Sequence, residues 1–293
     1  MSAGELRTLR RRIRSVQSTQ KITRAMELIA ASRITRARAQ VEATRPYAQM
    51  ITRVMRDLAA EHSVADHPLL AQREPSSVGV LVITSDRGLA GAYNANVLRR
   101  ADRLAEAEQQ AGRQVRRYAI GRKAETYYRY RGEPLAAGWT GMSDQPGYLD
   151  AQRAAERLMD DFTAERIDRV WLCFTSFRSA LSQVTQTVRL LPVEAEQMAG
   201  GREFPPQYLF EPEPGEILAR LVPRYVEHRL YAGLLESAAS EHASRQRAMK
   251  AATDNAGEMI ENLTREANRA RQAAITTEIS EIVGGAEALA SAS

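Results

Sequence analysis

The longest helix-forming run of the chain occupies residues 216–283 and reads EILARLVPRYVEHRLYAGLLESAASEHASRQRAMKAATDNAGEMIENLTREANRARQAAITTEISEIV. Its only proline, Pro223, lies near its start, and alanine recurs throughout. At about 1.5 Å per residue, such a helix is on the order of 100 Å long. Alanine at the positions that face a partner lets two helices approach closely. The run therefore predicts one strand of a slender rod.

A second helical run, residues 4–58, opens the chain. Its first apolar residues alternate three and four positions apart, as in the seam of a coiled coil: Leu6, Leu9, Ile13 and Val16. A further apolar stripe runs through Ile22, Met26 and Ile29, and Pro46 predicts a kink or an interruption. Because the two longest helices stand at opposite ends of the sequence, we expect them to pair.

Between these helices the sequence predicts a small α/β domain, because strands and helices alternate there. The continuous apolar run at residues 78–85 is typical of a buried parallel strand. Further strands are predicted at 115–120, 169–175 and 183–192, the last two as a hairpin, and helices at 93–111, 123–130 and 149–164.

The predicted organisation has five parts. They are an N-terminal helix at 1–60, the α/β domain at 78–192, a proline-rich loop at 193–215, a C-terminal helix at 216–285 and a tail at 286–293. The glycine pair at 284–285 is expected to end the last helix, since glycine favours helix C-termini.

Charge is unevenly distributed in this chain of 293 residues and formal net charge +5. The first 45 residues contain eleven basic and three acidic side chains, so the remainder is net acidic. The first helix is therefore expected to face an acidic partner. No apolar run reaches the roughly 18 residues that span a bilayer, and no signal peptide is evident. We expect a protein of the cytoplasm or of the cytoplasmic face of a membrane.

Few residues suggest catalysis. The turn from Asp86 to Gly91, between a strand and a helix, is similar to a phosphate-binding turn but lacks the glycine spacing of a nucleotide site. Alternatively, Gly88 and Gly91 simply permit a tight turn. Cys173, the sole cysteine, stands in an apolar run as a small hydrophobe or a reactive thiol. The four histidines lack metal-site spacing: His62, His67, His228 and His242. We predict a non-catalytic chain with no cofactor and no metal.

The arginine-rich first helix leaves two kinds of partner open. Arginine and lysine neutralise phosphates, so a basic coiled-coil scaffold or a nucleic-acid-binding protein is one reading. However, the apolar seam interrupts the basic residues, and no aromatic residue precedes Tyr47. A basic coiled-coil face that contacts protein explains the pattern as well.

Three separated segments resemble the gamma subunit of F-type ATP synthase. They are residues 14–33 (RSVQSTQKITRAMELIAASR), 84–94 (TSDRGLAGAYN), and the pair of strings 249–256 (MKAATDNA) and 270–286 (ARQAAITTEISEIVGGA). These strings are long and in the right order, and the layout covers nearly the whole chain. The resemblance implies an antiparallel, left-handed coiled coil of the terminal helices plus a central Rossmann-like α/β domain.

The resemblance also implies a function and partners. The expected protein is a non-catalytic rotor shaft, one copy per complex, inside a ring of three alpha and three beta subunits. Epsilon and the membrane c ring are expected at its foot, and no nucleic acid is expected. Proton flow turns the c ring and shaft, while the beta subunits make or hydrolyse ATP. Such a protein is peripheral on the cytoplasmic face of a bacterial cell membrane.

Contact residues follow from the resemblance, position by position. Met26 and Arg245 are expected near an acidic region of the beta subunits, although Met26 could instead fill the seam. Arg271 and Gln272 are expected at a catch loop of the ring, with Thr276 nearby. A solvated helix face is the alternative for each arginine. A Tyr-Leu-aromatic-Glu-Pro segment is expected near the c ring and epsilon, unless it is an ordinary turn: Tyr208, Phe210 and Glu211.

Overall fold

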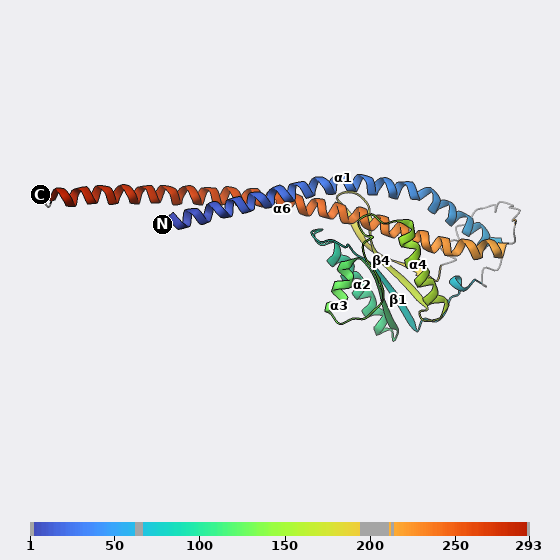
Figure 1. Cartoon of the computed structure of the whole chain (residues 1–293). Coiled ribbons are helices and arrows are strands. Elements are labelled where there is room, and N and C mark those ends of the chain that lie inside the picture. Colours follow the sequence, from blue (N-terminus) through green and yellow to red (C-terminus); the bar gives the residue numbers. More distant parts are fainter. Residues whose placement is uncertain (1–2, 62–66, 194–210, 212–213, 292–293) are drawn as a thin grey trace. The chain divides into compact units, whose positions relative to one another are not determined.

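The computed structural model describes residues 3–61, 67–193, 211 and 214–291 (Figure 1). The long helices are α1 (Ala3–Glu61) and α6 (Pro214–Ser291). Between them lie, in chain order, η2 (Pro68–Leu70), β1 (Ser77–Ile83), α2 (Tyr93–Gln110), β2 (Gln114–Ile120), α3 (Arg122–Tyr130), β3 (Leu135–Trp139), α4 (Tyr148–Thr163), β4 (Arg169–Phe177) and β5 (Gln183–Leu191). The mixed α/β class predicted from the sequence is confirmed.

The chain divides into two compact units, each described by itself. The coiled-coil unit contains residues 1–29 and 246–293, which are the start of α1 and the second half of α6. The domain unit contains residues 30–245, which are the rest of both helices and the whole sheet.

Within the coiled-coil unit, α1 and α6 pack side by side and antiparallel. The Thr23 and Thr253 hydroxyls lie 2.8 Å apart, and the Gln20 amide donates to the carbonyl oxygen of Thr253 at 3.4 Å. The position of a Cβ on Gly257 is only 3.2 Å from the same amide. A step toward the N-terminus of α1, from Thr23 to Gln20, thus corresponds to a step toward the C-terminus of α6, from Thr253 to Gly257. This confirms the predicted antiparallel pairing.

The seam of α1 keeps its spacing of three and four beyond the apolar start. The less exposed positions continue from Val16 to Gln20, Thr23 and Glu27. In contrast, Ile22 is 58% exposed and Ile29 is 54% exposed. The stripe predicted through these two isoleucines thus lies outside the seam, because the 3.5-residue repeat places polar residues at the packed positions.

Both long helices extend farther than predicted. α1 runs through Pro46, and Val41, Ile51 and Met55 on either side are buried. Packing therefore holds the helix together although the proline removes one backbone donor. α6 runs through the glycine pair 284–285 to Ser291, so the predicted helix end was wrong. Glycine inside a helix costs about 1 kcal/mol, which a long helix tolerates.

The domain unit is built on a five-stranded sheet of order β3-β2-β1-β4-β5. The first four strands are parallel, and β5 pairs antiparallel with β4, as the predicted hairpin required. This is the strand order of a Rossmann-like sheet, so that prediction is also confirmed. The edge strand β3 was missed. Its sequence, LAAGW, lacks the β-branched residues that mark strands.

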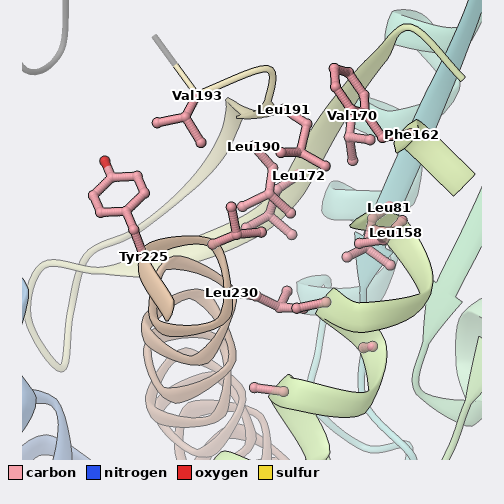
Figure 2. Close-up of a cluster of buried hydrophobic side chains, with 14 of the residues drawn as sticks. Leu81, Leu158, Phe162, Val170, Leu172, Leu190, Leu191, Val193, Tyr225 and Leu230 are labelled. Carbon is pink, nitrogen blue, oxygen red and sulfur yellow. The ribbon is translucent and has the colours of Figure 1, made fainter. Parts of the chain in front are cut away.

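Helices cover both faces of the sheet. On one face, α6 and α4 pack against β1, β4 and β5; Figure 2 shows Tyr225 and Leu230 of α6 beside Leu172, Leu190 and Leu191. On the other face, α2 and α3 pack against Val78, Val80 and Val82 of β1. At Gly233, α6 comes so close that an added Cβ would meet Leu172 at 3.1 Å. The first half of α6 thus forms part of the domain core, and the same helix continues into the coiled-coil unit.

Candidate functional site

A buried polar cluster surrounds Arg245, at the end of the domain unit's part of α6. The Arg245 guanidinium donates to the carboxylate of Glu241 at 2.6 Å and to the carbonyl oxygen of Gly88 at 3.3 Å. Arg245 is 7% exposed and Glu241 is 1% exposed. Burial raises the pKa of Glu241 to about 7, although the positive charge of Arg245 opposes the change. This pair joins α6 to the turn that follows β1.

The cluster extends to α1 through Asp144, in the segment between β3 and α4. Nε2 of His242 lies 3.2 Å from the Asp144 carbonyl oxygen and 3.8 Å from its carboxylate. Arg33 of α1 forms an ion pair with the same carboxylate. Burial lowers the pKa of His242, which favours a neutral ring that donates to the Asp144 carbonyl. We call Arg33, Asp144, Glu241, His242 and Arg245 the anchor cluster, because it holds α1 and α6 to the domain.

The turn at residues 84–94 positions the Gly88 carbonyl. The Asp86 carboxylate accepts hydrogen bonds from the backbone amides of Arg122 and Ser143, each at 3.0 Å. Burial raises the pKa of Asp86, but hydrogen bonds from the amides of Gly141, Ser143 and Arg122 outweigh it and hold this pKa below its ordinary value. An acidic side chain therefore occupies the α3 N-terminus, where a phosphate would otherwise be favoured. This geometry supports the structural reading of the turn.

The backbone of this turn differs in detail from the prediction. Positive φ angles occur at Gly91 (56°) and at Leu89 (62°), whereas Gly88 does not have one. The Ser85 amide and hydroxyl bond to the Asn94 side chain at 2.9 and 3.0 Å, and this contact closes the turn. The hydrogen bonds between Ser85 and Asn94 therefore help to hold Leu89 in the left-handed conformation, although leucine lacks the conformational freedom of glycine.

The predicted contact residues fall into three groups. On the coiled-coil unit, Arg271, Gln272 and Thr276 are exposed and close together on α6, and the Thr276 hydroxyl donates to the Gln272 carbonyl at 3.0 Å. Met26 is half-buried. Arg245, in the domain unit, is buried in the anchor cluster.

The third group is the proline-rich segment. Glu211 is exposed, while Tyr208 and Phe210 lie outside the described residues. The structure therefore describes one of these three predicted contact residues.

Sequence reasoning missed two features. Ile275, Ile279 and Ile282 form an exposed stripe at spacings of four and three, and Figure 1 shows α6 continuing here past the start of α1. Met259 of α6 is likewise 53% exposed. The spacing could have revealed the stripe, had the register of the two helices been known. The anchor cluster had no such signal, because its members are scattered along the chain.

Groups that could support catalysis are few in the described part of the chain. There, no three His, Cys, Asp or Glu side chains gather to hold a metal ion. Cys173 is buried on the α2 side of the sheet, and burial raises the pKa of its thiol to about 11, which makes it unreactive at neutral pH. No helix among the described ranges is long and apolar enough to cross a membrane.

Comparison with known proteins identifies the family. The ATP synthase family profile matches residues 5–289. ATP synthase gamma chains of a Parafrankia species and of Thermobifida fusca are 56% and 50% identical; alignments cover 99% of this chain and 99% and 98% of theirs. The chain belongs to the ATP synthase gamma chain family. This gamma chain is thus a non-catalytic subunit with the central-stalk rotor role, and the resemblance noted from the sequence is confirmed.

Solved structures agree in fold. The Tetrahymena thermophila mitochondrial ATP synthase central stalk with c ring contains a chain that is 26% identical, with a TM-score of 0.60, covering 79% of this chain and 99% of that one. A chain of the Euglena gracilis mitochondrial ATP synthase rotor has a TM-score of 0.66 at 17% identity, over 94% and 100% of the chains. At that identity the second likeness supports the fold alone.

Proposed function

We propose that this gamma chain is the rotating shaft of a bacterial F-type ATP synthase. One copy passes through a ring of three alpha and three beta subunits, and its foot binds epsilon and the membrane c ring. Proton flow through the c ring turns the shaft, and the beta subunits make or hydrolyse ATP in response. The protein is then peripheral, on the cytoplasmic face of the cell membrane. The bacterial relatives and the central-stalk neighbour support this assembly.

The thin seam of the coiled-coil unit is the observation that supports the shaft role best. Ala256, Ala267 and Ala270 are buried where α6 packs on α1. Short side chains at the interface reduce the distance between two helix axes. A narrow pair of helices can turn inside a ring, and close packing resists twisting of one helix around the other.

The outer face of the coiled-coil unit suits contact with a ring of subunits. Ile22, Leu28 and Ile29 of α1 are more than half exposed, as is Met259 of α6. Exposed apolar side chains gathered on a soluble protein mark interaction surfaces. We place Met26, Arg271, Gln272 and Thr276 at this interface with alpha and beta.

Two further assignments complete the proposed contacts. Arg245 supports the interface with the beta subunits indirectly, because its buried guanidinium already bonds to Glu241 and to the Gly88 carbonyl. Tyr208, Phe210 and Glu211 contact epsilon and the c ring at the foot.

Reconstitution tests the proposal. Alpha and beta subunits from the same source are mixed with and without this chain, and co-purification and sustained ATPase turnover are measured. We expect the chain to join the complex and turnover to depend on it. Well-folded partners that neither bind the chain nor change their turnover would contradict the shaft role. Salt-dependent binding to random duplex DNA in that case would favour the basic scaffold.

A further inference from the structure

A cavity of about 210 Å³ lies between α1 and α6 inside the domain unit. It is separate from the anchor cluster and from every contact residue named above. The residues that line it are Val41, Thr44, Arg45, Ala48, Ile51 and Thr52 on α1, and Tyr225, His228, Arg229, Ala232 and Glu236 on α6. The two helices thus leave a partly open cavity between them at this level.

Most of the wall is apolar. Val41, Ile51 and Tyr225 are buried, and the short side chains of Ala48 and Ala232 leave room between the helices. The Thr44 and Thr52 hydroxyls bond to the carbonyls of Val41 and Ala48, at 2.9 and 2.7 Å, so they are already satisfied. An apolar cavity of roughly 150 Å³ holds one benzene ring, so this cavity has room for a ring with a small substituent.

His228 supplies hydrogen-bonding capacity that the described residues leave unused. Its side chain is 6% exposed, and its ring packs on Tyr47 with centroids 4.7 Å apart. Burial lowers the pKa of His228, so the ring is neutral at pH 7 and offers one donor and one acceptor. Nothing in the described ranges forms a hydrogen bond with it. Because the ring nitrogens keep some solvent contact, a ligand inside the cavity can bond to them.

Glu236 provides a second unsatisfied group. Its Oε2 is buried and has no hydrogen-bond partner within the part of the chain that the structure describes. A carboxylate oxygen accepts strongly from a hydroxyl donor. Arg45 and Arg229 also belong to the lining, so residues of both charge signs border the cavity, and a charged ligand of either sign meets a like charge there. The charges therefore select an uncharged ligand that carries its own donor.

We propose that this cavity binds a small, uncharged ring compound with a hydroxyl group, the phenol class. The ring lies among the apolar residues between Ala48 and Ala232. The hydroxyl bonds to the His228 ring, which offers one donor and one acceptor. Glu236 lies two helical turns farther along α6, roughly 12 Å by the helix rise, and marks the far polar end of the cavity. A bound compound joins α1 to α6 at this level of the domain unit.

Calorimetric titration of the full-length chain with phenol tests the site, with toluene as a ligand of similar size that has no hydroxyl. We expect saturable binding of phenol with a Kd of about 1 mM and binding of toluene at least about tenfold weaker. Ring NMR signals, assigned by substituting each of the four histidines in turn, should show a shift for His228 and none for His67. Absence of saturable binding, or equal binding of toluene, would overturn the proposal.

Three variants separate binding at this site from general effects on the chain. Ala232→Leu fills the cavity and should abolish binding, whereas Ala39→Leu, on the exposed face of α1, should leave it unchanged. His228→Phe keeps an aromatic ring without nitrogens and should remove the preference for phenol over toluene. If Ala232→Leu impairs folding, His228→Phe still decides, and an unchanged preference in that variant contradicts the proposal.

Discussion

Arg245 donates a 2.6 Å hydrogen bond to Glu241, one helical turn earlier on α6, and both side chains are buried. The same guanidinium holds the Gly88 carbonyl of the turn after β1. Breaking a buried ion pair strongly destabilises a protein, because the remaining buried charge no longer has an opposite charge beside it. The match of residues 84–94 to the family thus has a structural explanation, since this turn binds the helix that becomes the shaft.

Replacing Arg245 with alanine should destabilise the chain by about 3 kcal/mol at pH 8, because it leaves an unpaired buried carboxylate. The loss should be smaller at pH 6, where Glu241 can take up a proton instead. Urea unfolding at both pH values measures the difference. Arg153→Ala, on the exposed surface of α4, is the control and should change stability little. Adding Glu241→Gln to Arg245→Ala should recover most of the loss. Equal losses for the two arginine variants would refute the explanation.

The pKa of Glu241 predicts a pH dependence of stability. Its value of about 7 in the folded chain exceeds the ordinary 4.5, so the folded state holds the proton more tightly than the unfolded state. The stabilisation is therefore complete below about pH 4.5 and is lost as the pH rises through 7. The lowered pKa of His242 acts in the opposite direction below pH 6.5.

Comparing wild type with Glu241→Gln isolates this effect from the histidines. The urea midpoint of the wild type should fall relative to that of the variant between pH 5 and pH 8. A constant difference between the two midpoints over this range would show that Glu241 does not titrate there.

Gly121, between β2 and α3, cannot accept a side chain. Its φ is +97°, and an added Cβ would lie 2.2 Å from the Thr84 carbonyl oxygen. Gly121→Ala should therefore destabilise the domain unit by about 3 kcal/mol or more. Gly112→Ala is a matched control, since its φ is +79° but nothing lies within 4 Å, and its cost should be about 1 kcal/mol. Thermal unfolding of the two variants gives the comparison, and equal shifts in Tm would mean that the backbone angle alone matters.

The regular parts of the fold could be predicted because their signals are local. The spacing of Leu6, Leu9, Ile13 and Val16 identified a seam, and the apolar run of β1 identified a buried strand. The continuation of the seam through Gln20 and Thr23 could not be read from hydrophobicity. Those positions are packed because the register of the pair places them there.

The polar contacts were inaccessible for a different reason. Arg33, Asp144 and His242 lie far apart in the sequence, and only the folded domain brings them together. Arg245 was identified through the family resemblance as a surface contact, whereas its burial against Glu241 depends on the domain core. Polar contacts between residues far apart in the chain produce no periodic pattern that a single sequence could reveal.

Gly257 and Gly284 test the closeness of the seam. Both are inside α6, where alanine is favoured over glycine by about 1 kcal/mol. An added Cβ at Gly257 would lie 3.2 Å from the Gln20 amide nitrogen, whereas Gly284 has nothing within 4 Å. Gly284→Ala should therefore slow amide hydrogen exchange in the helical turns around residue 284 by an amount close to the full helix preference of about 1 kcal/mol. Gly257→Ala should give a smaller gain, because Gln20 must shift. A larger gain at Gly257 would show that the helices are not in close contact there.

Arg271 and Gln272 test the proposed contact with the alpha and beta ring. Both side chains are exposed, so Arg271→Ala and Gln272→Ala should each change the chain's own stability by less than about 0.5 kcal/mol. If these two side chains contact the ring, each substitution should lower shaft-dependent ATPase turnover in the reconstituted complex about tenfold, equivalent to about 1.4 kcal/mol. Arg269→Ala removes a neighbouring exposed arginine and should leave turnover within about twofold. If all three variants lower turnover equally, the effect is a general one of charge or helix content, and no specific catch contact is made at these positions.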